Sequence, residues 1–162
     1  MCIRDSWGVD CLPPLVQEFP KRVAPEQVAR HLSSSNETWQ IPVGINEADL
    51  NPYVLEAFAG EHVLISGPAR SGKSTMLAAI HQMLMQQSPN TKVLVGAPRR
   101  SPLHQMLPGV MLVEELVDVV AAQSAVSERC IVMIDDAHLV ADESQVLTRV
   151  LATPDSPLPF IV

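Results

Sequence analysis

One short segment constrains this chain more than any other part of its sequence. Residues 67–74 carry glycine at the first and sixth positions, and lysine and serine follow the second glycine. This arrangement fits the pattern G-x-x-x-x-G-K-[ST], whose glycines let the backbone wrap around phosphate groups with its N–H groups pointing inward. At average composition the pattern arises by chance in roughly one window in tens of thousands. We therefore predict a loop that binds the phosphates of a nucleotide.

The sequence on both sides of this loop agrees with that prediction. Residues 62–66 form a compact apolar run typical of a buried parallel strand, and residues 73–87 place apolar side chains at helical spacing. A helix that begins at the loop adds the partial positive charge of its N-terminus to the phosphate site. These flanks disfavour the alternative interpretation, a glycine turn with an exposed Lys73.

Several residues of the loop have an expected role. We expect Lys73 to reach the β- and γ-phosphates, the Ser74 hydroxyl to bind Mg²⁺, and Thr75 to contact the α-phosphate. Arg70 could also touch a phosphate, although a solvated loop tip is the favoured interpretation. The predicted nucleotide-binding residues are Gly67, Pro68, Ala69, Arg70, Ser71, Gly72, Lys73, Ser74 and Thr75.

A second candidate site follows another apolar run. Residues 130–134 predict a buried parallel strand, and Asp135 and Asp136 come directly after it. Ligands bind beyond the carboxyl ends of such strands in open α/β sheets, so Asp135 is predicted to hold Mg²⁺ directly or through water. Ser74 and Asp135 are therefore the predicted metal ligands. Lys73, Asp135 and Asp136 are the predicted catalytic residues.

Asp136 bears on how active the predicted site is. ATPases whose sheet contains an added central strand usually have glutamate at this place, where it polarises the attacking water. Aspartate is one methylene shorter, so its carboxylate falls short by about 1 Å, and a misplacement of that order can cost about 100-fold in rate. We therefore expect nucleotide binding with slow or absent hydrolysis.

Strand and helix patterns alternate through residues 61–162. This alternation predicts the α/β class with a mainly parallel central sheet, and the loop makes it a P-loop NTPase of the RecA-like type with an added central strand (ASCE). Because the chain stops inside an apolar strand, we expect the core to be incomplete at its C-terminus. We also expect an open sheet edge and exposed apolar surface near Phe160. The predicted strands, besides 62–66 and 130–134, are 92–96, 109–113 and 159–162, and the predicted helices are 73–87, 114–126 and 144–151.

The residues before the core have a different composition. Residues 7–60 are a lead-in rich in proline and polar residues, with a short strand expected at 41–45, where Pro42 would place it at a sheet edge. Residues 25–32 have the pattern of a short helix with proline in its first turn. Residues 1–6 look like a translated adapter, and we expect this head to be non-native.

Composition narrows the classes of function. Eleven Lys and Arg residues stand against eighteen Asp and Glu, which argues against this segment gripping nucleic acid by itself. No apolar run approaches the roughly 18 residues of a membrane span, so we expect no membrane insertion by this segment. Three cysteines without metal spacing or a secretory signal indicate reduced cytosolic thiols.

Three polar residues outside the main motifs are weaker candidates. Arg99 and Arg100 could form a basic contact, although an exposed turn is favoured. His138 follows the acidic pair and could sense the γ-phosphate, although a structural role is favoured.

The order of these pieces resembles the FtsK/SpoIIIE family of P-loop ATPases. It looks most like the C-terminal domain of the type VII secretion coupling ATPases, the EccC and EssC group. The resemblance covers roughly residues 7–162, although Gly96 stands where an acidic residue is common in the family. The segments that carry it are Trp7 with Leu12–Leu15, the short strand pair suggested by 41–45 and 49–52, the core strand 62–68, residues 98–103, and the Asp-Asp Walker B run 134–140.

This resemblance implies ATP as the nucleotide and a cytoplasmic domain of a membrane-anchored protein. The family assembles into rings that pump DNA or export proteins. Three hypotheses stay open. The segment is a translocation or secretion ATPase domain with weak hydrolysis, a nucleotide-occupied structural module without turnover, or an AAA-type or signalling switch NTPase. The motifs alone do not distinguish ATP from GTP.

Overall fold

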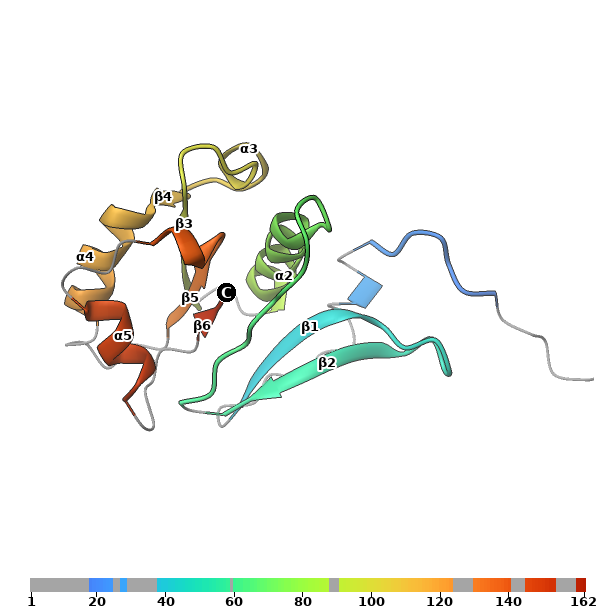
Figure 1. Cartoon of the computed structure of the whole chain (residues 1–162). Helices are drawn as coiled ribbons and strands as arrows, with labels where there is room; N and C mark the ends of the chain where they lie inside the picture. The colour runs from blue at the N-terminus through green and yellow to red at the C-terminus, as the bar shows by residue number, and fades with distance from the viewer. Residues whose placement is uncertain are drawn as a thin grey trace, which may run out of the picture.

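The computed structural model describes most of the chain from residue 18 onward. These residues form a two-stranded antiparallel hairpin and a four-stranded parallel sheet with helices packed on it (Figure 1). The predicted head, residues 1–6, and the lead-in segment 12–15 lie outside the described residues, and the predicted helix 25–32 is described only at 27–28. The described ranges are 18–24, 27–28, 38–58, 60–87, 91–123, 130–140, 145–153 and 160–162.

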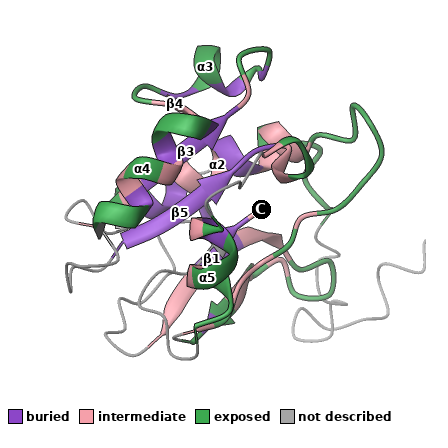
Figure 2. Ribbon diagram, turned by 60° about the vertical axis from the view of Figure 1, so that its left-hand side comes forward, coloured by how far each residue is buried: buried purple, intermediate pink, exposed green. Residues whose placement is uncertain are grey.

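The parallel sheet has the strand order β4-β3-β5-β6. All its strand pairs are parallel, so the predicted α/β class with a parallel sheet is confirmed. The central strand β5 is buried along its whole length, as Figure 2 shows. The predicted strand 109–113 is shorter in the structure, because α4 begins at Val113. The strands are β3 (Lys92–Ala97), β4 (Met111–Leu112), β5 (Cys130–Ile134) and β6 (Phe160–Ile161).

The predicted strand at 62–66 is only partly formed. One isolated parallel bridge joins Val63 to Ile161, and Ile65 N donates to Val162 O at 2.6 Å. The ladder is short because β6 itself has two residues, and Leu64 is 76% exposed. The prediction of a buried strand over the whole run is therefore wrong. Residues 63–65 nevertheless run beside β6.

The predicted open edge near Phe160 is also wrong for the backbone of β6. This strand pairs with β5 on one side and with Val63 on the other, and the side chain of Ile161 is fully buried. The side chain of Phe160 lies outside the described part of the structure, and among the described residues beside β6 Leu64 is exposed. As a result β6 lies between the segment that leads into the glycine loop and the strand that leads into the acidic pair.

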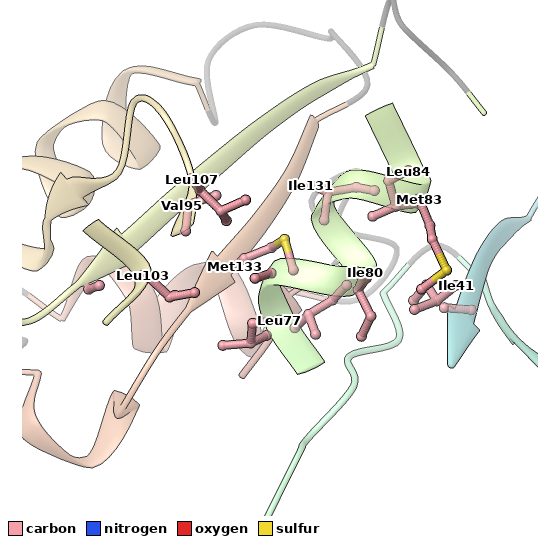
Figure 3. Packing of buried hydrophobic residues seen from close by; sticks show 14 of the residues in the cluster. Ile41, Leu77, Ile80, Met83, Leu84, Val95, Leu103, Leu107, Ile131 and Met133 are labelled. Carbon is pink, nitrogen blue, oxygen red and sulfur yellow. The ribbon is translucent and has the colours of Figure 1, made fainter. Parts of the chain in front are cut away.

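Helices cover both faces of the sheet. Helix α2 (Lys73–Gln87) packs on one face, where Ile131 and Met133 meet Leu77 and Ile80 (Figure 3). Helices α4 (Val113–Gln123) and α5 (Val146–Leu151) pack on the other face. Val132 of β5 belongs to that second cluster, with Leu116, Val120 and Leu147. Successive side chains of a strand point to opposite faces, and both Val132 and Met133 are fully buried, as predicted.

The hairpin lies on the far side of α2 from the sheet (Figure 1). Its strands β1 (Trp39–Ile45) and β2 (Pro52–Ala57) are antiparallel, with a register shift between Pro42 and Gly44. Ile41 is buried and lies near Met83 of α2 (Figure 3). Among the described residues β1 pairs with β2 alone, so the predicted short strand is longer than expected but does lie at an edge.

Two short helices follow strand ends. Helix α3 (Leu103–Met106) comes after β3, and the 3-10 helix η3 (Ala137–Leu139) comes after β5. Because the strands are parallel, both segments leave the sheet at its carboxyl edge. In the part of the chain that the structure describes, no helix has the length and hydrophobicity needed to cross a bilayer.

Candidate functional site

The glycine loop joins the segment 63–65 to α2. Gly72 has φ +95°, a conformation that side-chain-bearing residues rarely adopt, and α2 begins directly after it. A Cβ at Gly67 would lie 2.7 Å from Ser71 Oγ, so the exposed side chain of Ser71 would have to move to accept it. Of the two glycines of the predicted motif, Gly72 therefore has the stronger steric reason in this fold.

Lys73 folds back across the loop. Its Nζ donates to the carbonyl oxygens of Gly67 and Pro68, each at 3.1 Å. The ammonium group is thereby held at the mouth of the loop, where the predicted phosphate contacts would be made.

Asp135 lies at the carboxyl end of β5 and is only 1% exposed. Ser74 Oγ lies 3.1 Å from Asp135 Oδ1 and 2.9 Å from Oδ2, and donates to this carboxylate. The Asp135 backbone N–H donates to Gly96 O of the neighbouring strand at 3.0 Å. The fold thus brings together the two predicted metal ligands, which stand far apart in the sequence.

Ser101 also contacts this carboxylate, and the sequence analysis did not single it out. Its Oγ donates to Asp135 Oδ2 at 2.6 Å and accepts from the backbone N–H of Leu103 at 3.1 Å. Ser101 follows β3, whose Gly96 is in register with Ile134 of β5. The pairing of these two strands places residues just after β3 beside Asp135, and the amino-acid pattern of neither strand contains this register.

Asp136 has an unusual backbone conformation. Its φ of 50° and ψ of 46° lie in the left-handed region, and the chain turns there into η3. Among residues other than glycine, asparagine and aspartate adopt this conformation most readily. Asp136 is half-buried and lines the cavity beside the loop.

A cavity of about 260 Å³ lies between the glycine loop and the carboxyl edge of the sheet. A second hollow of about 630 Å³ follows the outer side of the loop and the first turns of α2, where Pro68, Ser71 and Thr75 line it. Lys73 and Gly67 line both spaces. The residues around the first cavity are Leu64, Ile65, Ser66, Gly67, Lys73, Leu77, Ile134, Asp135, Asp136, Ala137, His138 and Val162.

Some predicted residues lie at the margin of this arrangement. Ala69 and Arg70 are exposed at the loop tip and line neither space, so for Arg70 the favoured interpretation agrees with the structure. Arg99 and Arg100 form an exposed turn, as favoured. His138 is exposed and lines the cavity from η3.

Comparisons with known proteins find relatives in sequence and in fold. No protein-family model matches the chain. The chain is 33% identical over 106 residues to the ESX-1 secretion system protein EccCb1 of Mycobacterium tuberculosis. The matched residues are 59% of this chain and 18% of that protein. It is 30% identical over 97 residues to the ESX-1 secretion system protein EccCb1 of Mycolicibacterium smegmatis, and this match covers 54% of this chain and 16% of that protein. The chain spans less than a fifth of the length of these curated relatives.

Solved structures share the fold. The cytoplasmic domain of EssC matches with a TM-score of 0.69 at 16% identity, over 90% of this chain and 34% of that one. A structure described as an ATPase matches with a TM-score of 0.63 at 20% identity, over 90% and 72%. EssC (ATPases 2 and 3) from Geobacillus thermodenitrificans matches with a TM-score of 0.60 at 16% identity, over 89% and 32%.

The chain thus has an α/β fold shared with the solved domains of EssC. The particular resemblance predicted from the sequence, to the EccC and EssC type of FtsK/SpoIIIE-like ATPase domain of type VII secretion, is confirmed by both comparisons.

Proposed function

We propose that this chain is an ATP-binding P-loop domain of a secretion or translocation protein. The observation that carries the proposal is the contact between Ser74 Oγ and the buried carboxylate of Asp135, beside a glycine loop that opens a helix. This contact joins the two parts of a nucleotide–metal site that the sequence analysis predicted independently. Residues Gly67 to Thr75 would surround the phosphates.

The strand arrangement supports the RecA-like type with an added central strand. In the structure β6 lies between the segment before the glycine loop and β5, the strand that ends at Asp135. We propose that β6 is the added central strand of that type. The division of the chain at residues 6 and 60, which separates the head, the lead-in and the P-loop core, remains part of this proposal.

The side chains present suit Mg²⁺. Mg²⁺ prefers oxygen ligands and is usually bound by one or two carboxylates together with substrate phosphates. Asp135 supplies the carboxylate and Ser74 the hydroxyl, whose proton is already directed at Asp135, so that its lone pairs are free for a cation. When bound, the ion would neutralise charge on the β- and γ-phosphate oxygens.

Lys73 would exchange partners when a nucleotide binds. In the structure its ammonium group donates hydrogen bonds to the carbonyl oxygens of Gly67 and Pro68. Phosphate oxygens carry full charge and form stronger, charge-assisted hydrogen bonds than neutral carbonyls do. We therefore expect Lys73 to leave these carbonyls for the phosphates.

The conformation of Asp136 favours binding over turnover. A catalytic glutamate needs a longer side chain, and the left-handed backbone here suits aspartate better than glutamate. Hydrolysis by such sites also commonly needs an arginine from a neighbouring subunit. This observation favours a second candidate function, a nucleotide-occupied module that stabilises a larger assembly without turnover.

The setting of the domain is proposed from its relatives. Their names describe secretion-system proteins and a cytoplasmic domain, so we propose that this domain is located in the cytoplasm. We also propose that the full-length protein self-associates. The exported cargo would be protein, and DNA remains the alternative cargo. The comparisons do not favour the signalling-switch alternative.

Calorimetry with ATP and Mg²⁺ tests the nucleotide proposal. Lys73→Ala removes the cation that would pair with the phosphates, and we expect its affinity for ATP to fall more than tenfold. Lys92→Ala, at the exposed start of β3, is the matched control and should bind as the wild type does. Equal affinities in wild type and Lys73→Ala would overturn the proposal.

A further inference from the structure

We infer that Ser101 is a positioning residue for Asp135, which fixes the carboxylate that binds Mg²⁺ and ties it to the turn after β3. The inference rests on the proposed function and names a residue that the glycine loop and the acidic pair do not include. Ser101 lies at the carboxyl edge of the sheet and is 8% exposed.

The hydrogen bonds of Ser101 leave its hydroxyl no choice of direction. A hydroxyl has one proton to donate, and its oxygen can accept as well. The backbone N–H of Leu103 donates to Ser101 Oγ, so the single proton is directed at Asp135 Oδ2. At 2.6 Å this is a short hydrogen bond of the charge-assisted kind.

The two serines play different parts around the same carboxylate. Ser74 is shared between Oδ1 and Oδ2, whereas Ser101 contacts Oδ2 alone. Ser101 thus sets the rotation of the carboxylate, while Ser74 can adjust to a cation. Without Ser101, Ser74 would be the remaining side-chain donor that the described residues offer to Asp135.

Ser101 is itself held by the turn that follows β3. Its backbone N–H donates to Pro98 O at 2.8 Å, and the ring Nε2 of His104 lies 3.2 Å from the same oxygen. Leu103 is fully buried and anchors α3 below this turn. A chain of hydrogen bonds therefore leads from Pro98 O through Ser101 to the carboxylate of Asp135.

Partners of metal-binding side chains typically contribute 10–100-fold to metal affinity. We expect Ser101→Ala to weaken the Mg²⁺-dependent part of ATP binding by about tenfold or more. Binding of ATP in excess EDTA should stay within twofold of the wild type, because the loop and Lys73 are unchanged. Titrations of the whole chain with ATP at a series of Mg²⁺ concentrations measure both quantities.

Conservative variants separate positioning from a general loss of structure. Ser101→Thr keeps the hydroxyl and should keep most of the Mg²⁺ dependence. Ser101→Cys keeps a side chain of similar shape, but its thiol is only a weak hydrogen-bond donor, so this variant should lose the Mg²⁺ dependence. It therefore provides the test if Ser101→Ala does not fold. Thr153→Ala removes a hydroxyl bonded to Arg149 O at the end of α5 and should behave as the wild type.

The outcomes distinguish this inference from the proposed function. Wild-type Mg²⁺ dependence in Ser101→Ala, or in Ser101→Cys, overturns the role of Ser101 and leaves the nucleotide site standing. A wild-type chain that binds no ATP overturns the proposed function instead. In an Asp135→Asn background, a further loss on Ser101→Ala would show that Ser101 does not act through Asp135.

Discussion

At the scale of single residues, Asp136 shows how a backbone conformation limits a side chain. The left-handed conformation costs roughly 1–2 kcal/mol for an ordinary residue and less for aspartate, whose short side chain can hydrogen-bond locally. A glutamate at this position would extend its carboxylate further into the site, but its backbone would pay a larger cost for the left-handed conformation. Aspartate at this position therefore suits the turn into η3 as much as any chemistry.

We predict that the wild-type chain binds ATP far better than it hydrolyses it. Steady-state turnover should lie well below the roughly 10 s⁻¹ typical of enzymes. Asp136→Glu should raise the rate if the base position alone limits it, and should melt at a lower temperature because of the strained backbone. Phosphate release measured with excess Mg²⁺ and ATP gives the rate, and Asp118→Glu on the exposed face of α4 is the control. A wild-type rate near that of typical enzymes would restore the motor hypothesis.

At the scale of elements, β5 joins the two hydrophobic clusters that the described residues form. Met133 packs towards α2 and Val132 towards α4 and α5, so the strand has no solvated face. Its end also positions Asp135, the carboxylate of the proposed metal site.

A charge within this strand should be poorly tolerated. Val132→Asp buries an unpaired carboxylate and removes packing against Leu116 and Val120, so we expect a loss of several kcal/mol in the free energy of unfolding. Leu139→Asp, at a side chain that is 62% exposed in η3, should change it by about 0.5 kcal/mol or less. Urea unfolding followed by circular dichroism measures both. Similar losses in the two variants would contradict the buried position of β5.

The elements also show which features the sequence could predict. Apolar runs at 92–96 and 130–134 and the helical spacing of 73–87 identified β3, β5 and α2, because burial on both sides leaves a clear hydrophobic signal. Residues 62–66 have the same signal, yet a strand needs a partner of equal length and β6 offers two residues. The contact of Ser101 with Asp135 depends on the register between β3 and β5, which the amino-acid pattern of neither strand contains.

At the scale of the whole molecule, the candidate site joins a helix on one face of the sheet to the carboxyl ends of two strands. Ser74 belongs to α2, Asp135 follows β5 and Ser101 follows β3. A ligand that contacts all three would restrain the helix and both strands together.

Nucleotide binding should therefore stabilise the entire fold. A ligand at a hundred times its dissociation constant stabilises the native state by about 2.7 kcal/mol, which for a chain of this size raises the melting temperature by roughly 5–10 °C. We expect this rise with Mg²⁺ and ATP in the wild type, and a rise of about half that size or less in Lys73→Ala, because a tenfold weaker affinity still leaves about 1.4 kcal/mol of stabilisation at the same ATP concentration. Thermal melts by differential scanning fluorimetry measure it, with Lys92→Ala as the control. A shift of equal size in both lysine variants would contradict binding through the loop.

The pairing of Val63 with Ile161 has a consequence for synthesis on the ribosome. These residues stand roughly a hundred positions apart, and contacts between such distant parts form slowly because a long loop must close first. The segment 63–65 before the glycine loop therefore cannot pair with β6 until almost the whole described chain has emerged from the ribosome. During that interval its apolar side chains are open to chaperones and to other nascent chains.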